Sequence, residues 1–269
     1  MKNLIVRTIS GIVLVVILIF GVSYSPLTRI IVLSAVGIGS VAELTHLIKK
    51  SGVPSLNWFT ILTAILILGS QVVNVIAKSE VISLLHVISL LSLLLILRCF
   101  LELYRKKENP FNSIANEFFA IIYTVIPIFL LNIVNDYRIV LILFFVVWAN
   151  DVGAYLVGVT FGKHKLFERI SPKKSWEGFF GGLLFAIATA SISGHIFFQH
   201  SPYIWGVIGL LVGLAGVVGD LVESMYKRSI NIKDSGNIIP GHGGFLDRFD
   251  AMFFAIPIYF FTLHLLKLL

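Results

Sequence analysis

Long runs of apolar residues separated by short polar segments make up most of the chain. A helix needs about 20 mostly apolar residues to cross the hydrocarbon core of a bilayer. The runs are long enough for this, and the polar breaks between them contain ordinary turn residues. The pattern therefore predicts nine membrane-spanning helices, at residues 8–23, 27–47, 57–77, 81–103, 114–134, 138–161, 178–198, 203–226 and 249–268.

Composition supports the same fold class. Hydrophobic residues make up 57% of the 269 residues and charged residues only 13%, and the mean hydropathy is +0.95. Such a chain has too few charged side chains to cover a water-exposed surface. We therefore expect an all-α, polytopic membrane protein. Lys2 and Arg7 precede the first run as in a signal peptide, but no A-x-A-like site follows, so a retained helix is expected.

The basic residues predict how the chain is oriented. If it crosses nine times, 17 of the 21 Lys and Arg residues fall on one side, and Arg29, Lys78, Arg138 and Lys267 fall on the other. Because cytoplasmic loops are enriched in Lys and Arg, we expect a cytoplasmic N-terminus and an outside C-terminus in the cell (inner) membrane. The net charge of +7 then reflects topology and an anion site rather than a nucleic-acid surface.

Polar residues are distributed unequally along the chain. Residues 1–110 contain few ionisable groups within the predicted spans, and we interpret them as scaffold helices. Residues 111–269 contain several such groups and the two longest charged loops on the predicted cytoplasmic side. Ionisable residues inside a membrane are costly and usually functional. The second region is therefore the predicted catalytic region, with a polar site that faces the cytoplasm.

The signature segment, residues 224–250, has the highest density of candidate chemistry. It reads SMYKRSINIKDSGNIIPGHGGFLDRFD and contains four basic and three acidic residues between two apolar runs. Ionised groups next to hydrocarbon are costly without partners, which favours a bound metal and an anionic substrate. The simpler alternative is a loop whose acids and bases neutralise one another, but that would not explain the spacing of its carboxylates.

Carboxylates recur at helical spacing on both sides of this segment. Asp220 lies on the same helical face as Glu223, Ser224 and Lys227, and Asp247 and Asp250 are three residues apart. Oxygen donors, a single cysteine (Cys99) and one nearby histidine favour Mg²⁺ or Mn²⁺ over zinc. The glycines of the GHGG turn, residues 241–244, would let the backbone approach a phosphate closely.

A second cluster precedes the signature segment. Asp151 follows Asn150 inside the sixth apolar run, where function or a hydrogen bond to a neighbouring helix would explain it. The sequence SPKKSWEG, residues 171–178, resembles a capped helix start with basic groups directed at a phosphate. Positive charge on the cytoplasmic side would explain Lys163, Lys165 and Arg169 equally well.

The signature segment resembles that of the phosphatidate cytidylyltransferases, the CDP-diacylglycerol synthases. The matching positions are Ser224, Lys227, Arg228, Lys233, Asp234, Gly236, Pro240, His242, Gly243, Gly244, Asp247, Arg248 and Asp250. SPKKSWEG and the WANDVGAY stretch around Asp151 are also similar to family segments, so the resemblance covers roughly residues 145–255. Tyr226 departs mildly, because the family usually has a plain hydrophobic residue there.

This resemblance implies transfer of CMP from CTP to phosphatidate with Mg²⁺, in phospholipid biosynthesis. The expected metal ligands are Asp220 and Asp247, with Asp250 and Asp151 as further contributors, and a second cation is left open. The expected catalytic residues are Lys227, Arg228, Lys233, Asp234, His242 and Arg248. Substrate contacts are expected from Ser171, Lys174, Ser175, Ser224, Gly243 and Gly244. The expected partners are CTP, phosphatidate and the bilayer, with a homodimer as a further expectation.

Two alternatives are left open by the sequence. The resemblance covers the nucleotide and metal half of the site, so the acceptor could be another lipid phosphate, as in the CDP-archaeol synthases. A different class, an ion-coupled transporter, would also bury carboxylates in spans. A transport pathway should however place ionisable groups towards both faces, and the outer ends of these spans are nearly free of them.

Overall fold

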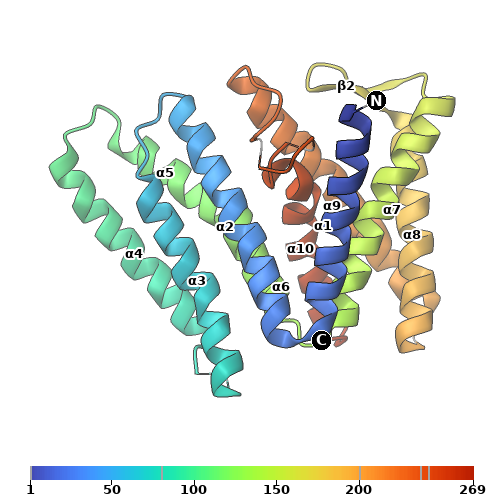
Figure 1. Ribbon diagram of the computed structural model, residues 1–269, viewed down its shortest axis with the longest axis horizontal. Helices are drawn as coiled ribbons and strands as arrows, with labels where there is room; N and C mark the ends of the chain where they lie inside the picture. Colours follow the sequence, from blue (N-terminus) through green and yellow to red (C-terminus); the bar gives the residue numbers. More distant parts are fainter. Residues whose placement is uncertain (1, 80, 200, 237, 242) are drawn as a thin grey trace. The chain divides into compact units, whose positions relative to one another are not determined.

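The computed structural model describes residues 2–79, 81–199, 201–236, 238–241 and 243–269. Most of them lie in helices, which confirms the predicted all-α class (Figure 1). Within this part of the chain, eight helical segments are long and apolar enough to cross a membrane. The helices are α1 (Lys2–Tyr24), α2 (Pro26–Lys50), α3 (Asn57–Ala77), α4 (Leu84–Arg105), α5 (Pro110–Ala120), the π-helix η1 (Ile121–Val125), α6 (Ile126–Ile133), α7 (Tyr137–Phe161), α8 (Trp176–Phe198), α9 (Pro202–Ser229) and α10 (Leu246–Leu265).

Eight of the nine predicted spans correspond to these eight segments within the described residues. The predicted span 114–134 is built from α5, η1 and α6, which together form one apolar segment, Pro110–Ile133. The predicted span 249–268 corresponds to α10, which has Asp247, Arg248 and Asp250 in its first turns and is not among the eight. The orientation of the termini stays a prediction.

The chain forms two compact units. The first unit consists of Met1–Ile133 and Asp234–Asp247, and the second of Val134–Lys233 and Arg248–Leu269. The signature segment is thus divided between the units. The predicted division at residue 110 separates scaffold from catalytic region, whereas the two units are separated by packing. The functional division therefore stays a prediction.

In the first unit, α2 is the central helix and contacts α1, α3 and the α5–η1–α6 segment. Leu33, Leu44 and Leu47 on α2 are fully buried. The helix begins at a capping box, in which the side chains of Ser25 and Thr28 each accept a backbone N–H of the other residue. Much of the apolar surface of α1 and α4 remains exposed, as expected for helices that face lipid.

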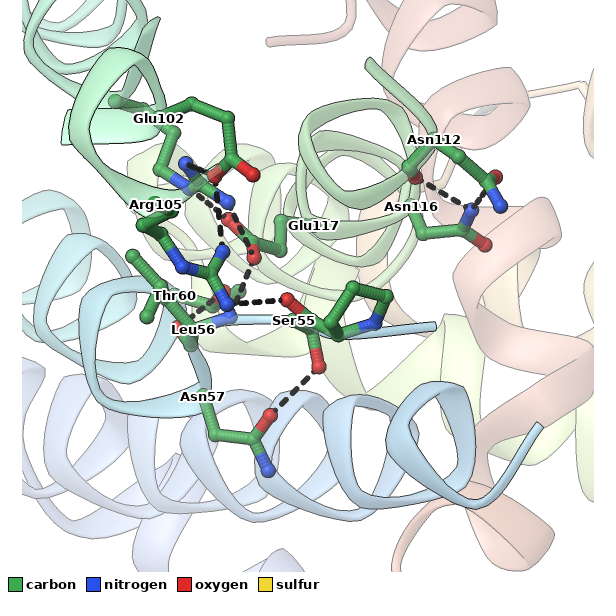
Figure 2. A network of polar contacts seen from close by, with 11 residues as sticks. Ser55, Leu56, Asn57, Thr60, Glu102, Arg105, Asn112, Asn116 and Glu117 are labelled. Atoms are coloured by element: carbon green, nitrogen blue, oxygen red, sulfur yellow. Dashed lines mark hydrogen bonds and ion pairs between the residues drawn. The ribbon is translucent and has the colours of Figure 1, made fainter. Parts of the chain in front are cut away.

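A buried ionic cluster connects α4, α5 and the start of α3 (Figure 2). The fully buried guanidinium of Arg98 forms ion pairs with Glu102 on its own helix and with Glu117 on α5. Arg105 contacts Glu102 and donates a hydrogen bond to the carbonyl of Pro54, at 2.9 and 2.7 Å. Separating a buried charge from its partners is strongly destabilising. The cluster therefore holds α4, α5 and the segment that leads into α3 together.

In the second unit, α8 packs against both α7 and α9, which also contact each other, and glycines permit the close approach. A Cβ atom on Gly178 would lie 2.7 Å from the carbonyl oxygen of Ala154, and one on Gly182 would lie 2.8 Å from that of Asn150. Small residues at helix interfaces are typical of membrane proteins, because they let backbones come together. Tyr259 on α10 donates a 2.9 Å hydrogen bond to the carbonyl of Ile139 on α7.

A short hairpin between α7 and α8 was not predicted. β1 (Lys165–Phe167) pairs antiparallel with β2 (Ser171–Ser175) next to the end of α7 (Figure 1). Backbone N–H groups of Lys163 and His164 donate to the carboxylate of Glu177 in the first turn of α8, at 3.1 to 3.3 Å. This contact holds the hairpin against the helix start.

Candidate functional site

The predicted helix start in SPKKSWEG is confirmed, with Ser175 as its cap. The Ser175 hydroxyl accepts a 3.2 Å hydrogen bond from the Gly178 N–H, and α8 begins at Trp176. Ser171 instead begins strand β2, so it lies four residues before the helix cap. Lys173 and Lys174 also lie on β2, directly before this cap.

Lys174 and Asp220 meet in the second unit. The Lys174 ammonium forms an ion pair with the carboxylate of Asp220 on α9. Ser224, one helical turn further along α9, donates a 3.2 Å hydrogen bond to the same carboxylate. Both members of the ion pair are partly exposed, so they remain accessible to a ligand. The structure therefore brings together three of the residues predicted from the sequence.

Two further predicted carboxylates lie within electrostatic range of Asp220. Asp151 on α7 and Asp250 on α10 each repel Asp220, and they repel each other. The close approach of α9 and α10 explains the position of Asp250, since a Cβ atom on Gly219 would lie 2.6 Å from its carbonyl oxygen. Arg248, which is exposed, attracts Asp151.

Asp151, Lys174 and Asp220 line a cavity of about 520 Å³ in the second unit. Its lining also includes the polar residue Ser175 and the largely apolar residues Tyr155, Val159 and Phe179. A cavity of this size, with both charged and apolar surface, can accept an amphipathic or nucleotide-sized ligand. Lys165 and Lys173 also line it. The sequence left a role for Lys165 open and placed Lys173 among the basic groups of the SPKKSWEG segment.

Three further basic residues that were predicted as site residues lie on α9 or just after it. Lys227 forms a 2.5 Å ion pair with the buried carboxylate of Glu223, its i−4 neighbour. The guanidinium of Arg228 donates a 3.0 Å hydrogen bond to the carbonyl of Ile232 at the helix end. Lys233 is exposed. All three follow Asp220 within 13 positions of the chain.

The other half of the signature segment belongs to the first unit. The carboxylate of Asp247 accepts backbone hydrogen bonds from Ser235 and Gly244, with donor-to-acceptor distances of 2.9 to 3.1 Å. Gly243 has φ +86°, and a Cβ atom there would lie 2.6 Å from an Asp247 carboxylate oxygen. Asp247 thus organises the glycine turn around it. Asp234 is exposed in this unit, and His242 lies outside the described residues.

The donor chemistry of the second unit suits a magnesium ion. Asp151, Asp220 and Asp250 offer hard oxygen atoms, and a cation would relieve their mutual repulsion. Across the described residues, no three His, Cys, Asp or Glu side chains are grouped closely enough to form a metal site by themselves. Mg²⁺ commonly uses one or two carboxylates together with water and substrate phosphates, which agrees with this arrangement.

Comparison with known proteins finds similarity over most of the chain. The model of the cytidylyltransferase family matches residues 5–266. A phosphatidate cytidylyltransferase of Bacillus subtilis strain 168 is 49% identical over 121 residues, which make up 45% of each protein. The phosphatidate cytidylyltransferase of Staphylococcus aureus strain COL is 47% identical over 121 residues, covering 44% of this chain and 46% of that protein. The matched segment thus spans less than half the length of these relatives.

Proposed function

Because the chain belongs to the cytidylyltransferase family, we propose that it transfers CMP from CTP to phosphatidate, giving CDP-diacylglycerol and pyrophosphate. The observation that carries this proposal is the Lys174–Asp220 ion pair, within electrostatic range of Asp151 and Asp250, at a cavity lined by both charged and apolar residues. The charged lining residues suit phosphates, and the apolar ones suit the hydrophobic part of a lipid substrate.

In the proposed reaction, a phosphate oxygen of phosphatidate attacks the α-phosphorus of CTP. The bond from that phosphorus to the pyrophosphate leaving group breaks, and pyrophosphate takes the bonding electron pair. The attacking oxygen is already anionic, so the step needs no strong general base. The reacting groups are both polyanions, and their repulsion has to be reduced before they can meet.

Basic side chains of this chain would reduce that repulsion. We assign the binding of the triphosphate and the lipid phosphate to Lys174, Lys227, Arg228, Lys233 and Arg248. Asp220, with Asp151, Asp250 and Asp247 as further candidates, would hold Mg²⁺. The bound ion would neutralise charge that develops on the phosphate oxygens. His242 would orient a phosphate by a hydrogen bond.

The proposed site faces the cytoplasm. CTP is a cytosolic nucleotide and phosphatidate lies in the membrane leaflet, so both could reach a polar site at the cytoplasmic surface. The excess of Lys and Arg in the loops and helix ends around this site supports the same orientation.

The test is CMP transfer from labelled CTP to phosphatidate in detergent micelles, with and without Mg²⁺. We expect CDP-diacylglycerol only with Mg²⁺, and a loss of about 100-fold or more in Asp220→Asn, because preorganised charge is a large part of such catalysis. Glu168→Gln, an exposed acid on the same unit, is the control and should retain activity. Use of CTP without product from phosphatidate would point to another lipid phosphate, and no CTP chemistry would refute the proposal.

A further inference from the structure

A buried carboxylate from the N-terminal scaffold holds the glycine turn of the signature segment. Glu43 lies on α2 and is only 6% exposed. Its carboxylate accepts hydrogen bonds from the backbone N–H groups of Phe245 and Leu246, at 3.0 and 2.9 Å. The hydroxyl of Ser235 donates a third, at 3.1 Å. About 200 positions separate Glu43 from these donors in the chain, yet all four residues belong to the first unit.

The position of this carboxylate explains why the contact is stable. Helix α10 begins at Leu246, and the first N–H groups of a helix have no partner within the helix. Glu43 accepts two of them and places negative charge at the positive end of the helix dipole. A buried charge is costly unless it is hydrogen-bonded, and here three donors satisfy it.

The glycines of the turn fit closely around Glu43. A Cβ atom on Gly244 would lie 2.1 Å from one Glu43 carboxylate oxygen, and a Cβ atom on Gly236 would lie 2.8 Å from the other. No side chain larger than hydrogen fits at either position without displacing the carboxylate. These glycines therefore have a packing requirement in addition to any approach to phosphate.

Ser235 connects Glu43 to Asp247. Its hydroxyl donates to Glu43, and its backbone N–H donates to the carboxylate of Asp247. Gly244 is shared in a similar way, because its N–H donates to Asp247 and its Cα lies against Glu43. The two carboxylates thus form one clamp on the turn, and moving Glu43 would move Asp247 as well.

We propose that Glu43 is a positioning residue for the reaction, which sets the geometry of Gly243, Gly244 and Asp247 without touching substrate. This inference rests on the proposed function, since it assigns the turn a part in it. It gives the scaffold half of the chain a role in the chemistry: α2 supplies the acceptor that fixes the start of α10.

Glu43→Gln tests the inference, because the amide keeps the shape but offers an N–H group to backbone donors. Losing a buried hydrogen bond costs about 1–3 kcal/mol, so we expect amide hydrogen exchange in residues 235–246 to become about tenfold faster or more. We also expect the half-saturating Mg²⁺ concentration to rise about tenfold, because a free-energy loss of the same size would weaken Mg²⁺ binding through a displaced Asp247 carboxylate. Loss of folded protein alone would lower the maximal rate and leave that concentration unchanged.

Two companion variants make the result interpretable. Glu108→Gln changes an exposed carboxylate of the same unit and should alter neither readout. Ser235→Ala removes one of the three donors and should accelerate exchange in residues 235–246 by a smaller factor, which keeps the inference testable if Glu43→Gln fails to fold.

The outcomes separate this inference from the proposed function. Unchanged exchange in residues 235–246 would refute the clamp, and faster exchange with an unchanged Mg²⁺ requirement would refute the positioning role. If the wild-type protein transfers no CMP, the proposed function fails, and the positioning role fails with it. The exchange data would still decide whether Glu43 holds the turn.

Discussion

At the scale of single residues, an ion pair joins two predicted site residues that are far apart in the chain. Lys174 and Asp220 are paired although 45 residues lie between them, and neither is fully buried. Partly exposed ion pairs contribute little to stability, with a median of about 0–1 kcal/mol. Stability therefore does not explain the pair well, and a role in binding anions explains it better.

Lys174→Ala should thus impair activity much more than folding. We expect kcat/KM for CTP to fall by about 100-fold, because a charge-assisted contact to phosphate contributes about 1.5–3 kcal/mol. The thermal unfolding temperature in detergent should change by only a few degrees at most, as estimated for a weak ion pair.

Lys107→Ala is the matched control for this substitution. Lys107 is exposed and belongs to the loop after α4, outside the proposed site. It should leave both readouts near their wild-type values. Near-normal CTP kinetics in Lys174→Ala would exclude Lys174 from the substrate contacts, and a large fall in unfolding temperature would assign it to the fold instead.

At the scale of secondary structure, the apolar runs predicted the helices well because each run is about one bilayer thick. The hairpin β1–β2 could not be predicted in this way. Its strands have three and five residues, they contain Pro172 and several lysines, and the loop before them is hydrogen-bonded to Glu177 on α8. Periodicity says little about segments this short.

Helix packing in the second unit depends on glycines that the pattern of apolar runs does not single out. Gly178→Ala should destabilise the protein by about 1–3 kcal/mol, as overpacking does, because its Cβ atom would meet the carbonyl oxygen of Ala154. Thermal unfolding in detergent measures this. The displaced helix start should also reduce CMP transfer, since Ser175 and Lys174 directly precede α8.

Gly69→Ala is the control within the same experiment. Gly69 is on α3, and a Cβ atom there would meet nothing within 4 Å. Alanine is the better helix former, so no loss of stability is expected. An equal loss in the two variants would show that close helix approach at Gly178 is not the cause.

At the scale of the whole molecule, much of the candidate site could be predicted from the sequence, because its residues are concentrated at helix ends and in one motif. Spacing on a helix predicted that Ser224 would join Asp220, and it does. Glu43 could not be assigned in this way. It lies alone on α2, and only the folding of the chain brings it to residues 235–246. A single acidic residue in a predicted span does not indicate a role by itself when the residues that it contacts are unknown.

The predicted orientation can be tested on the whole protein. A tag fused after Leu269 should be accessible from outside the cell only, and one fused before Met1 should be accessible only after permeabilisation. Accessibility to a membrane-impermeant reagent measures both. Protection of the Leu269 tag in intact cells, with labelling after permeabilisation, would mean that α10 does not complete a crossing.

The ionic cluster around Arg98 has a consequence for how the protein enters the membrane during synthesis. Helix α4 emerges from the ribosome with Arg98, Glu102 and Arg105, one more positive than negative charge, and the balancing carboxylate of Glu117 follows on α5. The side chain of Arg98 is fully buried in the folded unit, and a buried charge without its partners is costly. The two helices are therefore expected to leave the translocation channel as an electrically neutral pair, so that assembly of the first unit is coupled to the order in which its helices are made.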